Sequence, residues 1–517
     1  MTMKMWKKGL AVLLSAVCVM TCMTGCGKED SGKKGGNSTS DIEISYWNAG
    51  LDKYWLEAVI EAFEKKYPEY NVSYTASASQ NASYAGFGVE GDTVDLYLST
   101  ALDQSKLETL DDVLNSTADG DKKPIAEKFS EGYLALAKAA DGHYYDLTYG
   151  GGVIGFVYNT EHFKDAGITQ LPRTTNEISI VCDKLYSKGY TPLCHFSPTG
   201  YWHWMSEVFF SQYEGMDYYI NNFYSSTDEN GTSPSKDVFK KQDGRYEALK
   251  AYEKIITPEY VLEGSNSVDH VTAQTQFLNG KASMMVNGSW ITTEMASVGG
   301  LENYAMLRTP VISSITDKLT TVKTEGNLRK LISAIDAVAD GEKQLSDYAD
   351  GENYKIGDLT VSAADWEYVR AARLTVSANY SGHTAQIPNY SNNIEGAKEF
   401  LRFLYSDEGY KVYEDTLKIP LPLEMSDESM LDTSKWNSFE LSQLKLLKES
   451  DHIATSDIRS KHRIFTDGGA NSFASYNYIT AFCTNNAKDR KTANQIWEII
   501  VDRVDEEYEN SWLKNIK

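Results

Sequence analysis

The stretch from residue 277 to residue 290 (FLNGKASMMVNGSW) constrains the fold more than any other part of the chain. The Asn279-Gly280 pair predicts the end of a helix, because glycine readily adopts the left-handed conformation that closes a helix C-terminus. The short apolar run 282–286 predicts a buried strand, and the turn after it ends at Ser289, which can cap a following helix. Trp290 therefore lies where a strand ends and a helix begins, the edge at which open α/β sheets bind ligands. Two interpretations of this indole remain, a cover for the core or a platform for a ligand.

An alternation of strand and helix patterns begins at Asp41. Residues 42–47 alternate in polarity and predict a strand, and apolar residues at helical spacing over 56–67 predict a helix. Residues 72–75 predict the second strand. A strand-helix-strand unit is typical of a parallel sheet, so we expect an α/β fold.

Aromatic and polar residues follow two of the predicted strands. Trp47 and Asn48 lie at the tip of the first strand. Residues 95–98 predict a further strand, and its exit loop runs from Ser99 to Asp103. Because ligands bind beyond the carboxyl ends of such strands, we expect these side chains to contribute to a ligand site.

A run of aromatic residues follows a Pro/Gly loop at residues 198–200. Tyr201, Trp202 and Trp204 are hard to explain as a solvent-facing surface. If Trp204 belongs to the following helix and packs in the core, at most two of the three face a cleft. His203 has no partner with metal-ligand spacing and is expected to be structural.

The first 40 residues predict export and attachment. A basic start and an apolar run too short to span a bilayer comfortably precede Met23-Thr24-Gly25-Cys26. This layout resembles a bacterial lipoprotein signal, with residues 1–25 removed and Cys26 lipidated, although Met23 replaces the usual leucine. A plain secretory signal or an uncleaved anchor is the alternative. Residues 26–40 are then the lipidated cysteine and a polar, Gly/Ser-rich tether.

Composition excludes some classes of partner. The formal net charge is −23, from 50 basic and 73 acidic residues. Nucleic-acid phosphates need lysine and arginine partners, so this balance argues against nucleic-acid binding. The 34 tyrosines combine apolar faces with polar tips, which suits a surface for amphipathic ligands, but compositional drift would produce the same excess.

No pattern for catalysis, a cofactor or a metal is found. Beyond residue 26 the cysteines are Cys182, Cys194 and Cys483, an odd number without a C-x-x-C pair, so neither a disulfide framework nor a zinc site is supported. Cys182 and Cys194 could pair if the fold brings them together. A P-loop, a nucleophile elbow and a Cys-His pair are also missing.

Three stretches together resemble the extracellular sugar-binding proteins of ABC importers, the group that includes maltose-binding protein. Residues 277–290 are similar to that family's F-x-x-G-K-A-x-M-x-x-x-G-x-W segment. Residues 141–174 resemble its G-K-x-Y … G-x-x-Y-N-x-x-x-F-x-x-A-G-I … P-x-T signature, and residues 387–409 resemble its A-K-E-F-L-x-F-L-x-S-x-E-G helix. The matches occur in the family's order, with roughly a third of the folded part unmatched.

The resemblance implies a periplasmic-binding-protein-like fold of type II. Such a fold has two α/β lobes, each a sheet flanked by helices, with the ligand cleft between them. We expect residues 41–150 and 305–385 to form lobe 1, with an insertion at about 311–375. Residues 151–304 and 386–517 are expected to form lobe 2.

The resemblance also implies site residues. Trp290 is expected to stack on a sugar ring, as the matching tryptophan does in the family, and Tyr201 to lie over the sugar with Trp202 beside it. Gly150-Gly151-Gly152 replaces the proline or polar group of many relatives, which implies backbone amides at the ligand and a hinge. The full expected set is Trp47, Asn48, Ser99, Asp103, Tyr149, Gly151, Tyr201, Trp202, Trp290 and Tyr476.

The function implied is that of a receptor rather than an enzyme. It captures a carbohydrate, more specifically an oligosaccharide, and delivers it to ABC transporter permease subunits. The receptor is expected to be a monomer outside the cytoplasm, attached through the lipid on Cys26 to the cell membrane of a Gram-positive bacterium.

Two alternatives are kept. The first is a receptor for a polyamine, a peptide or a metal. A polyamine site needs acidic residues beside Trp47 and Trp290, where the adjacent residues are Asn48 and Ser289. The second is a surface glycosidase, which needs two carboxylates facing each other across the substrate. No acidic pair framed by two strand ends is found.

Overall fold

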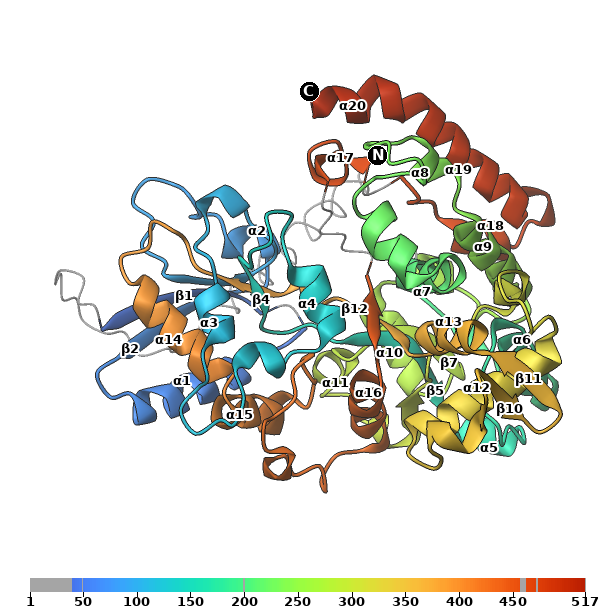
Figure 1. The fold of residues 1–517 in the computed structure, drawn as a ribbon, viewed down its shortest axis with the longest axis horizontal. Coiled ribbons are helices and arrows are strands. Elements are labelled where there is room, and N and C mark those ends of the chain that lie inside the picture. The colour runs from blue at the N-terminus through green and yellow to red at the C-terminus, as the bar shows by residue number, and fades with distance from the viewer. Residues whose placement is uncertain (1–39, 49, 199, 456–461, 471–472, 517) are drawn as a thin grey trace, which may run out of the picture. The chain divides into compact units, whose positions relative to one another are not determined.

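The computed structural model describes residues 40–48, 50–198, 200–455, 462–470 and 473–516. Residues 1–25, Cys26 and the tether up to residue 39 lie outside the described residues. None of the helices in the described ranges has the length and apolar character needed to cross a membrane. Two sheets, each covered by helices, form two lobes (Figure 1).

The first sheet has the strand order β2-β1-β3-β13-β4. β1 pairs in parallel with β2 and β3, as the strand-helix-strand pattern predicts, and β13 runs antiparallel to β3 and β4. The alternation in β1 places Ile42, Ile44 and Tyr46 in the core. Its strands are β1 (Asp41–Trp47), β2 (Asn71–Ser77), β3 (Leu96–Ser99), β4 (Leu147–Thr148) and β13 (Thr384–Gln386). Its helices are α1 (Tyr54–Lys66), α2 (Gln80–Ser83), α3 (Asp111–Asn115), α4 (Glu131–Ala137), α14 (Ile394–Leu404) and α15 (Asp407–Leu417).

The second sheet has the order β14-β12-β5-β7-β6, and β8 also pairs with β5. Both β5 and β7 are buried along their whole length, as expected for strands covered on two faces. Its strands are β5 (Val153–Asn159), β6 (Leu193–Cys194), β7 (Met284–Gly288), β8 (Tyr304–Met306), β12 (Thr375–Ala378) and β14 (His452–Ala454). The helices of the same part of the chain are α5 (Thr160–Asp165), α6 (Thr175–Lys188), α7 (Trp202–Glu214), α8 (Asp237–Lys240), α9 (Asp243–Ile255), α10 (His270–Leu278), α11 (Ile291–Glu294), α16 (Ser438–Lys448), α17 (Arg463–Thr466), α18 (Tyr478–Cys483), α19 (Ala493–Glu507) and α20 (Leu513–Asn515).

The predicted insertion packs on the second lobe. It contains α12 (Glu325–Ala339), α13 (Ala363–Arg373) and a small sheet of β9 (Ala349–Asp350), β10 (Asn353–Ile356) and β11 (Leu359–Ser362). Leu331, Val361 and Trp366 are buried in the same core as the residues of α7 and α9. Arg373 ties the two helices together, since its guanidinium bonds Asp336 of α12 at 2.8 and 2.9 Å.

The expected division of the chain between the lobes needs correction. β8 and β12 belong to the second sheet, although residues 305–385 were expected in lobe 1. The chain returns to the first sheet only at β13, and α14 then packs on α1 through Phe400 and Phe63, whose rings lie 5.2 Å apart. β14 lies in the second sheet again. The sequence hid this path because β12 is only four residues long and lies directly after the insertion.

The two cysteines that could have paired are free thiols. Cys182 of α6 and Cys194 of β6 are both buried. They belong to different cores, on opposite faces of the second sheet, because neighbouring residues of a strand point in opposite directions. Leu193 points into the core that holds Cys182, so Cys194 points away from it.

Candidate ligand-binding site

Segments from both sheets meet where the chain passes between the lobes. We call this region the junction and define it as residues 47–48, 50–51, 149–152, 288–294 and 379–383. The two crossing segments are bonded to each other, since the amide of Tyr149 donates to the carbonyl of His383 at 3.1 Å and that of Asn379 to Gly152 at 3.2 Å. The amide of Ser289 donates to Val153 at 3.0 Å. The junction therefore brings together four segments that are far apart in sequence.

Trp47 is held on the first-lobe side of the junction. Its ring stacks on the imidazole of His383 with centroids 4.7 Å apart and planes 4° apart. Tyr149 is fully buried and donates its hydroxyl proton to the Trp47 carbonyl at 2.9 Å, so it supports the loop below the expected ligand. Burial lowers the pKa of His383 to about 4, which keeps its ring neutral at pH 7.

Buried polar atoms of the junction lack partners. Among the described residues, Trp47 Nε1, Asn48 Oδ1 and Asn379 Oδ1 have no hydrogen-bond partner. Each unpaired group of this kind destabilises the protein by about 1–3 kcal/mol. A ligand with hydroxyl groups could supply the missing hydrogen bonds.

The three consecutive glycines are explained by close packing. A Cβ at Gly150 would lie 2.3 Å from Leu51, and one at Gly152 would lie 2.5 Å from the Cβ of Ser289. Gly151 has φ of +102°, and a Cβ there would lie 2.8 Å from Asn379 Oδ1. All three residues are buried, which differs from the expectation that their amides face a ligand. Side chains would push the crossing segments apart.

A second aromatic cluster lies on the second-lobe side. The rings of Trp290 and Tyr201 meet edge to face at 5.2 Å, and Tyr201 meets Phe196 in the same way at 4.8 Å. Trp290 lies between β7 and α11, as predicted, and is 7% exposed. The predicted cap by Ser289 is wrong, because its hydroxyl bonds the Val153 carbonyl instead and α11 has no side-chain cap.

The loop that follows Trp47 contacts the start of α11. Thr293 of α11 donates its hydroxyl proton to the Gly50 carbonyl at 2.6 Å. A Cβ at Gly50 would lie 3.4 Å from the Cβ of Trp290. Gly50 is three residues from Trp47, so the loop that carries Trp47 at its start packs against the helix that follows Trp290.

Glu294 adds to the junction a carboxyl group that was not predicted from the sequence. Gln274 donates to its Oε2 at 2.8 Å, and its Oε1 lies 3.5 Å from the Cβ that Gly50 would carry. Burial raises the pKa of this carboxyl. Burial and the nearby Glu294 together raise the pKa of Tyr201 to about 12. The signal was available, because Glu294 follows Trp290 by one helical turn.

Three predicted residues have structural roles instead. Ser99 is buried, and its hydroxyl lies 2.7 Å from that of Ser83. Asp103 caps a short turn by accepting from the amide and hydroxyl of Ser105 at 3.1 and 2.7 Å, and these bonds lower its pKa. Trp202 is 1% exposed and packs on Phe156 and other core rings. These three residues have the same kind of position in the sequence as Trp47 and Trp290. They differ from them in the direction in which their side chains point.

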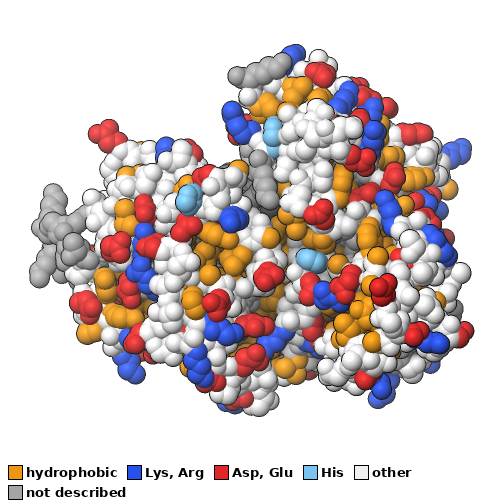
Figure 2. Space-filling model, in the orientation of Figure 1, with side chains coloured by type: hydrophobic (Ala, Val, Ile, Leu, Met, Phe, Trp, Pro, Cys, Tyr) orange, Lys and Arg blue, Asp and Glu red, His pale blue; other side chains and the backbone are white. Residues whose placement is uncertain are grey.

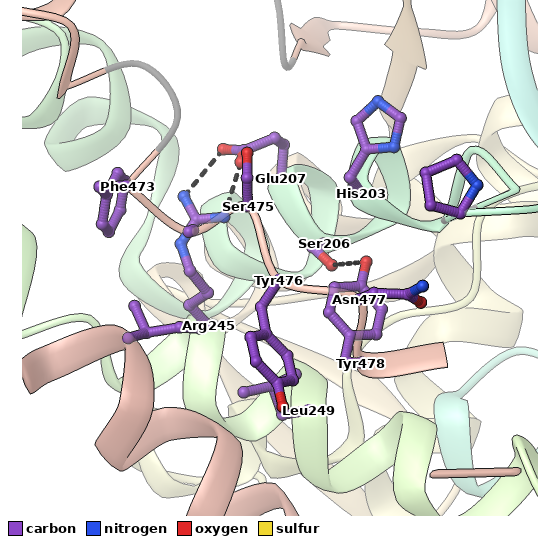
Figure 3. A pocket seen from close by; sticks show the side chains of 13 residues that line it. His203, Ser206, Glu207, Arg245, Leu249, Phe473, Ser475, Tyr476, Asn477 and Tyr478 are labelled. Atoms are coloured by element: carbon purple, nitrogen blue, oxygen red, sulfur yellow. Dashed lines mark hydrogen bonds and ion pairs between the residues drawn. The ribbon is translucent and has the colours of Figure 1, made fainter. Parts of the chain in front are cut away.

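Tyr476, the last of the predicted residues, lines a pocket of about 440 Å³ within the second lobe (Figure 3). We call it the α7–α9 pocket, since it lies between these helices and residues 473–478. Its residues are Pro198, His203, Ser206, Glu207, Arg245, Leu249, Phe473, Ala474, Ser475, Tyr476, Asn477, Tyr478 and Ile500.

An ion pair forms part of the pocket wall. Arg245 donates to both oxygens of Glu207 at 2.6 and 3.1 Å, and both side chains are buried (Figure 3). The guanidinium also lies 4.7 Å from the ring of Phe210 and 5.2 Å from that of Phe473, which fixes its position. The pair is therefore rigid and carries no net charge.

Comparison with known proteins agrees with this architecture. Residues 48–411 match the family model described as bacterial extracellular solute-binding protein. Among solved structures, a probable secreted solute-binding lipoprotein from Streptomyces coelicolor has a TM-score of 0.59 at 12% identity and covers 90% of this chain and 97% of that one. RafE from Streptococcus pneumoniae has a TM-score of 0.56 at 14% identity, with 92% and 98% covered.

A third structure, the bacterial solute receptor AcbH, described as preferring β-D-galactopyranose, has a TM-score of 0.55 at 14% identity, with 91% and 98% covered. A search of curated proteins finds no match. The family model covers most of the folded part, and the two-lobe fold is the same in all three structures. The chain belongs to the bacterial extracellular solute-binding protein family.

Proposed function

We propose that the protein is the receptor of an ABC importer, that it captures an oligosaccharide at the junction, and that it delivers this sugar to the permease. The observation that carries the proposal is that Trp47 of one lobe and the Trp290–Tyr201 cluster of the other belong to segments that contact each other through the bond from Thr293 to Gly50. Movement of the lobes about the crossing segments would then enclose the sugar and complete the surface that the permease recognises.

The chemistry of the junction suits a sugar. A pyranose ring has apolar C–H faces, and burying them against indole and phenol rings contributes about 25 cal/mol per Å². Its hydroxyl groups both donate and accept, so they complement Trp47 Nε1, Asn48 Oδ1 and the carboxylate of Glu294. His383, which stacks on Trp47, is neutral at pH 7 and therefore adds no charge to the site of a neutral ligand.

Related structures support a carbohydrate over other solutes. They include AcbH, described as preferring β-D-galactopyranose, RafE in complex with raffinose, and a chitin oligosaccharide binding protein. Three similar structures, each described with a different sugar, therefore share this architecture, and two of the three sugars are longer than one unit.

Attachment to the membrane is part of the proposal. The N-terminal pattern favours a lipid on Cys26, followed by a polar tether, so that a monomeric body stays outside the cytoplasm of a Gram-positive cell. On the face shown in Figure 2, acidic and basic side chains are interspersed. The acidic excess of the whole chain does not favour direct adhesion to anionic lipid, so attachment would depend on the anchor.

A cationic solute such as a polyamine is the second candidate. Glu294 favours a polyamine, because a polyamine site needs an acidic residue beside the aromatic rings. Glu294 places such a carboxyl group near Trp290 and Tyr201. A single carboxylate that already accepts a bond from Gln274 also suits a sugar hydroxyl, so the proposal keeps the oligosaccharide first.

Replacement of Trp290 tests the proposal. Trp290→Ala in the chain from Gly27 to Lys517 should reduce the affinity for the captured sugar at least a hundredfold by calorimetry. Trp436→Ala is the matched control, because Trp436 is also 7% exposed but lies outside the junction. Equal affinities of the two variants, with equal thermal stability, would refute the role of the aromatic cluster.

A further inference from the structure

We propose that the α7–α9 pocket is a second binding site for a neutral sugar unit, and that it holds the part of an oligosaccharide extending beyond Trp290 and Tyr201. This inference rests on the proposed function, since it concerns how far the same ligand reaches. It assigns roles to Tyr476 and His203 that the junction does not use.

The pocket adjoins the aromatic cluster of the second lobe. Tyr201 contacts Trp290 at 5.2 Å and directly precedes α7, while His203 on the first turn of α7 lines the pocket. One residue separates Tyr201 from His203, so their Cα atoms lie within about 7.6 Å of each other. The pocket wall and Tyr201 are thus neighbours along the chain, which is the closeness that a ligand reaching from the junction to the pocket requires.

The pocket has the dimensions of a ligand site. Its volume of about 440 Å³ lies within the range of about 300–1,000 Å³ that is usual for small-molecule sites. α7 and α9 form one side, and residues 473–478 form the other (Figure 3).

The charges of the pocket favour a neutral ligand. Glu207 and Arg245 neutralise each other through two hydrogen bonds, and the rings of Phe210 and Phe473 hold the guanidinium in place. Burial lowers the pKa of His203 to about 4, so the imidazole is neutral at pH 7. An anion or a cation would find no uncompensated partner among these groups, whereas a polyol meets fixed donors and acceptors.

The rim supplies the two contacts that sugars use. Tyr476 is half-buried and offers a ring face for the C–H groups of a pyranose. Ser475 and Asn477, its neighbours, are exposed; Ser475 carries a hydroxyl, and the side-chain oxygen of Asn477 accepts from the amide of Thr480 at 3.1 Å, which leaves its NH₂ group as a donor. The deeper Ser206 is already engaged, because its hydroxyl lies 3.1 Å from that of Tyr478 (Figure 3). The rim and the ion pair are thus the polar surfaces left for a ligand.

Sugar ladders of increasing length test the inference. Affinities are measured by calorimetry for matched series of one to four units of mannose, galactose, glucose and N-acetylglucosamine. We expect the wild-type affinity to rise at least tenfold when the sugar becomes long enough to enter the pocket. Tyr476→Ala should remove that increase and leave the affinity for the shorter sugars within twofold.

A second variant guards against a folding defect. Ser475→Arg places a long side chain at the exposed rim and should block the longer sugars alone. Tyr186→Ala is the control, because Tyr186 is 52% exposed on α6 and outside the pocket. Calorimetry of each variant is paired with its thermal unfolding temperature.

The failures of the two proposals are distinguishable. Equal losses for short and long sugars, or no change for any length in both pocket variants, would overturn the pocket while sugar binding itself stands. If no sugar of any series binds the wild type, the proposed function fails and the pocket proposal fails with it.

Discussion

The buried carboxyl of Glu414 makes a quantitative prediction about stability. It is fully buried beneath the junction, where Tyr410 donates to Oε1 at 2.6 Å and Oε2 has no partner among the described residues. Burial raises its pKa to about 8 from 4.5. Tyr380, which lies on a crossing segment, and Tyr413 are nearby phenols, and the positive charge of Lys448 lowers the pKa of the carboxyl by less than burial raises it.

The sign of the pH dependence follows from proton binding. Between pH 4.5 and pH 8 the folded protein keeps a proton on Glu414 that the unfolded chain has lost. The free energy of unfolding therefore falls as the pH rises, by about 1.4 kcal/mol per pH unit for this group. Across the three units from pH 5 to pH 8 this amounts to about 4 kcal/mol. The stabilisation is complete below pH 4.5 and lost above pH 8.

Glu414→Gln should remove this contribution, because the amide has the shape of the protonated acid and does not titrate. We expect the variant to be more stable than the wild type at pH 8, with a flatter profile in urea denaturation from pH 5 to pH 9. Glu61→Gln, at an exposed position on α1, is the control. If the free energy of unfolding of the wild type and of Glu414→Gln changed with pH in the same way, Glu414 would not be a protonated acid in the folded protein.

Three further predictions concern the junction and the anchor. Gly151→Ala should destabilise the fold by about 1–3 kcal/mol in urea denaturation, because φ of +102° and the contact with Asn379 both oppose a side chain; an unchanged midpoint would contradict the packing described. Glu294→Gln should weaken sugar binding, and wild-type affinity should fall as the pH drops toward the raised pKa of this carboxyl; a flat calorimetric profile would exclude its contact with the ligand. Cys26→Ser should move the protein from the membrane fraction to the medium in cell fractionation, whereas retention would point to an uncleaved anchor.

Regular elements of the fold were predictable where the residue pattern was long. The alternation over 42–47, the helical spacing over 56–67 and the Asn279-Gly280 helix end correspond to β1, α1 and the end of α10. The return path between the lobes was not predictable from pattern. β12 and β13 are four and three residues long, and their partners are set by pairing with distant strands rather than by local preference.

The candidate site was predictable in part. Trp47 and Trp290 follow strands, and this position alone indicates the ligand edge of a sheet. The direction in which each side chain points could not be predicted from the sequence. Trp202 is adjacent to Tyr201 yet turns into the core, and Tyr149 turns beneath Trp47 to bond its carbonyl. Glu294 was not among the predicted residues, although it follows Trp290 by one helical turn.

The most direct test of the central claim is a thermal-shift screen of the chain from Gly27 to Lys517, which contains the whole compact body of residues 39–517. The screen covers mono- and oligosaccharides, polyamines and peptides. A ligand at a hundred times its dissociation constant stabilises the folded state by about 2.7 kcal/mol. We expect such a shift with one class of oligosaccharide, with the sugar recovered intact. A shift with polyamines or peptides alone, or steady hydrolysis of the sugar, would contradict it.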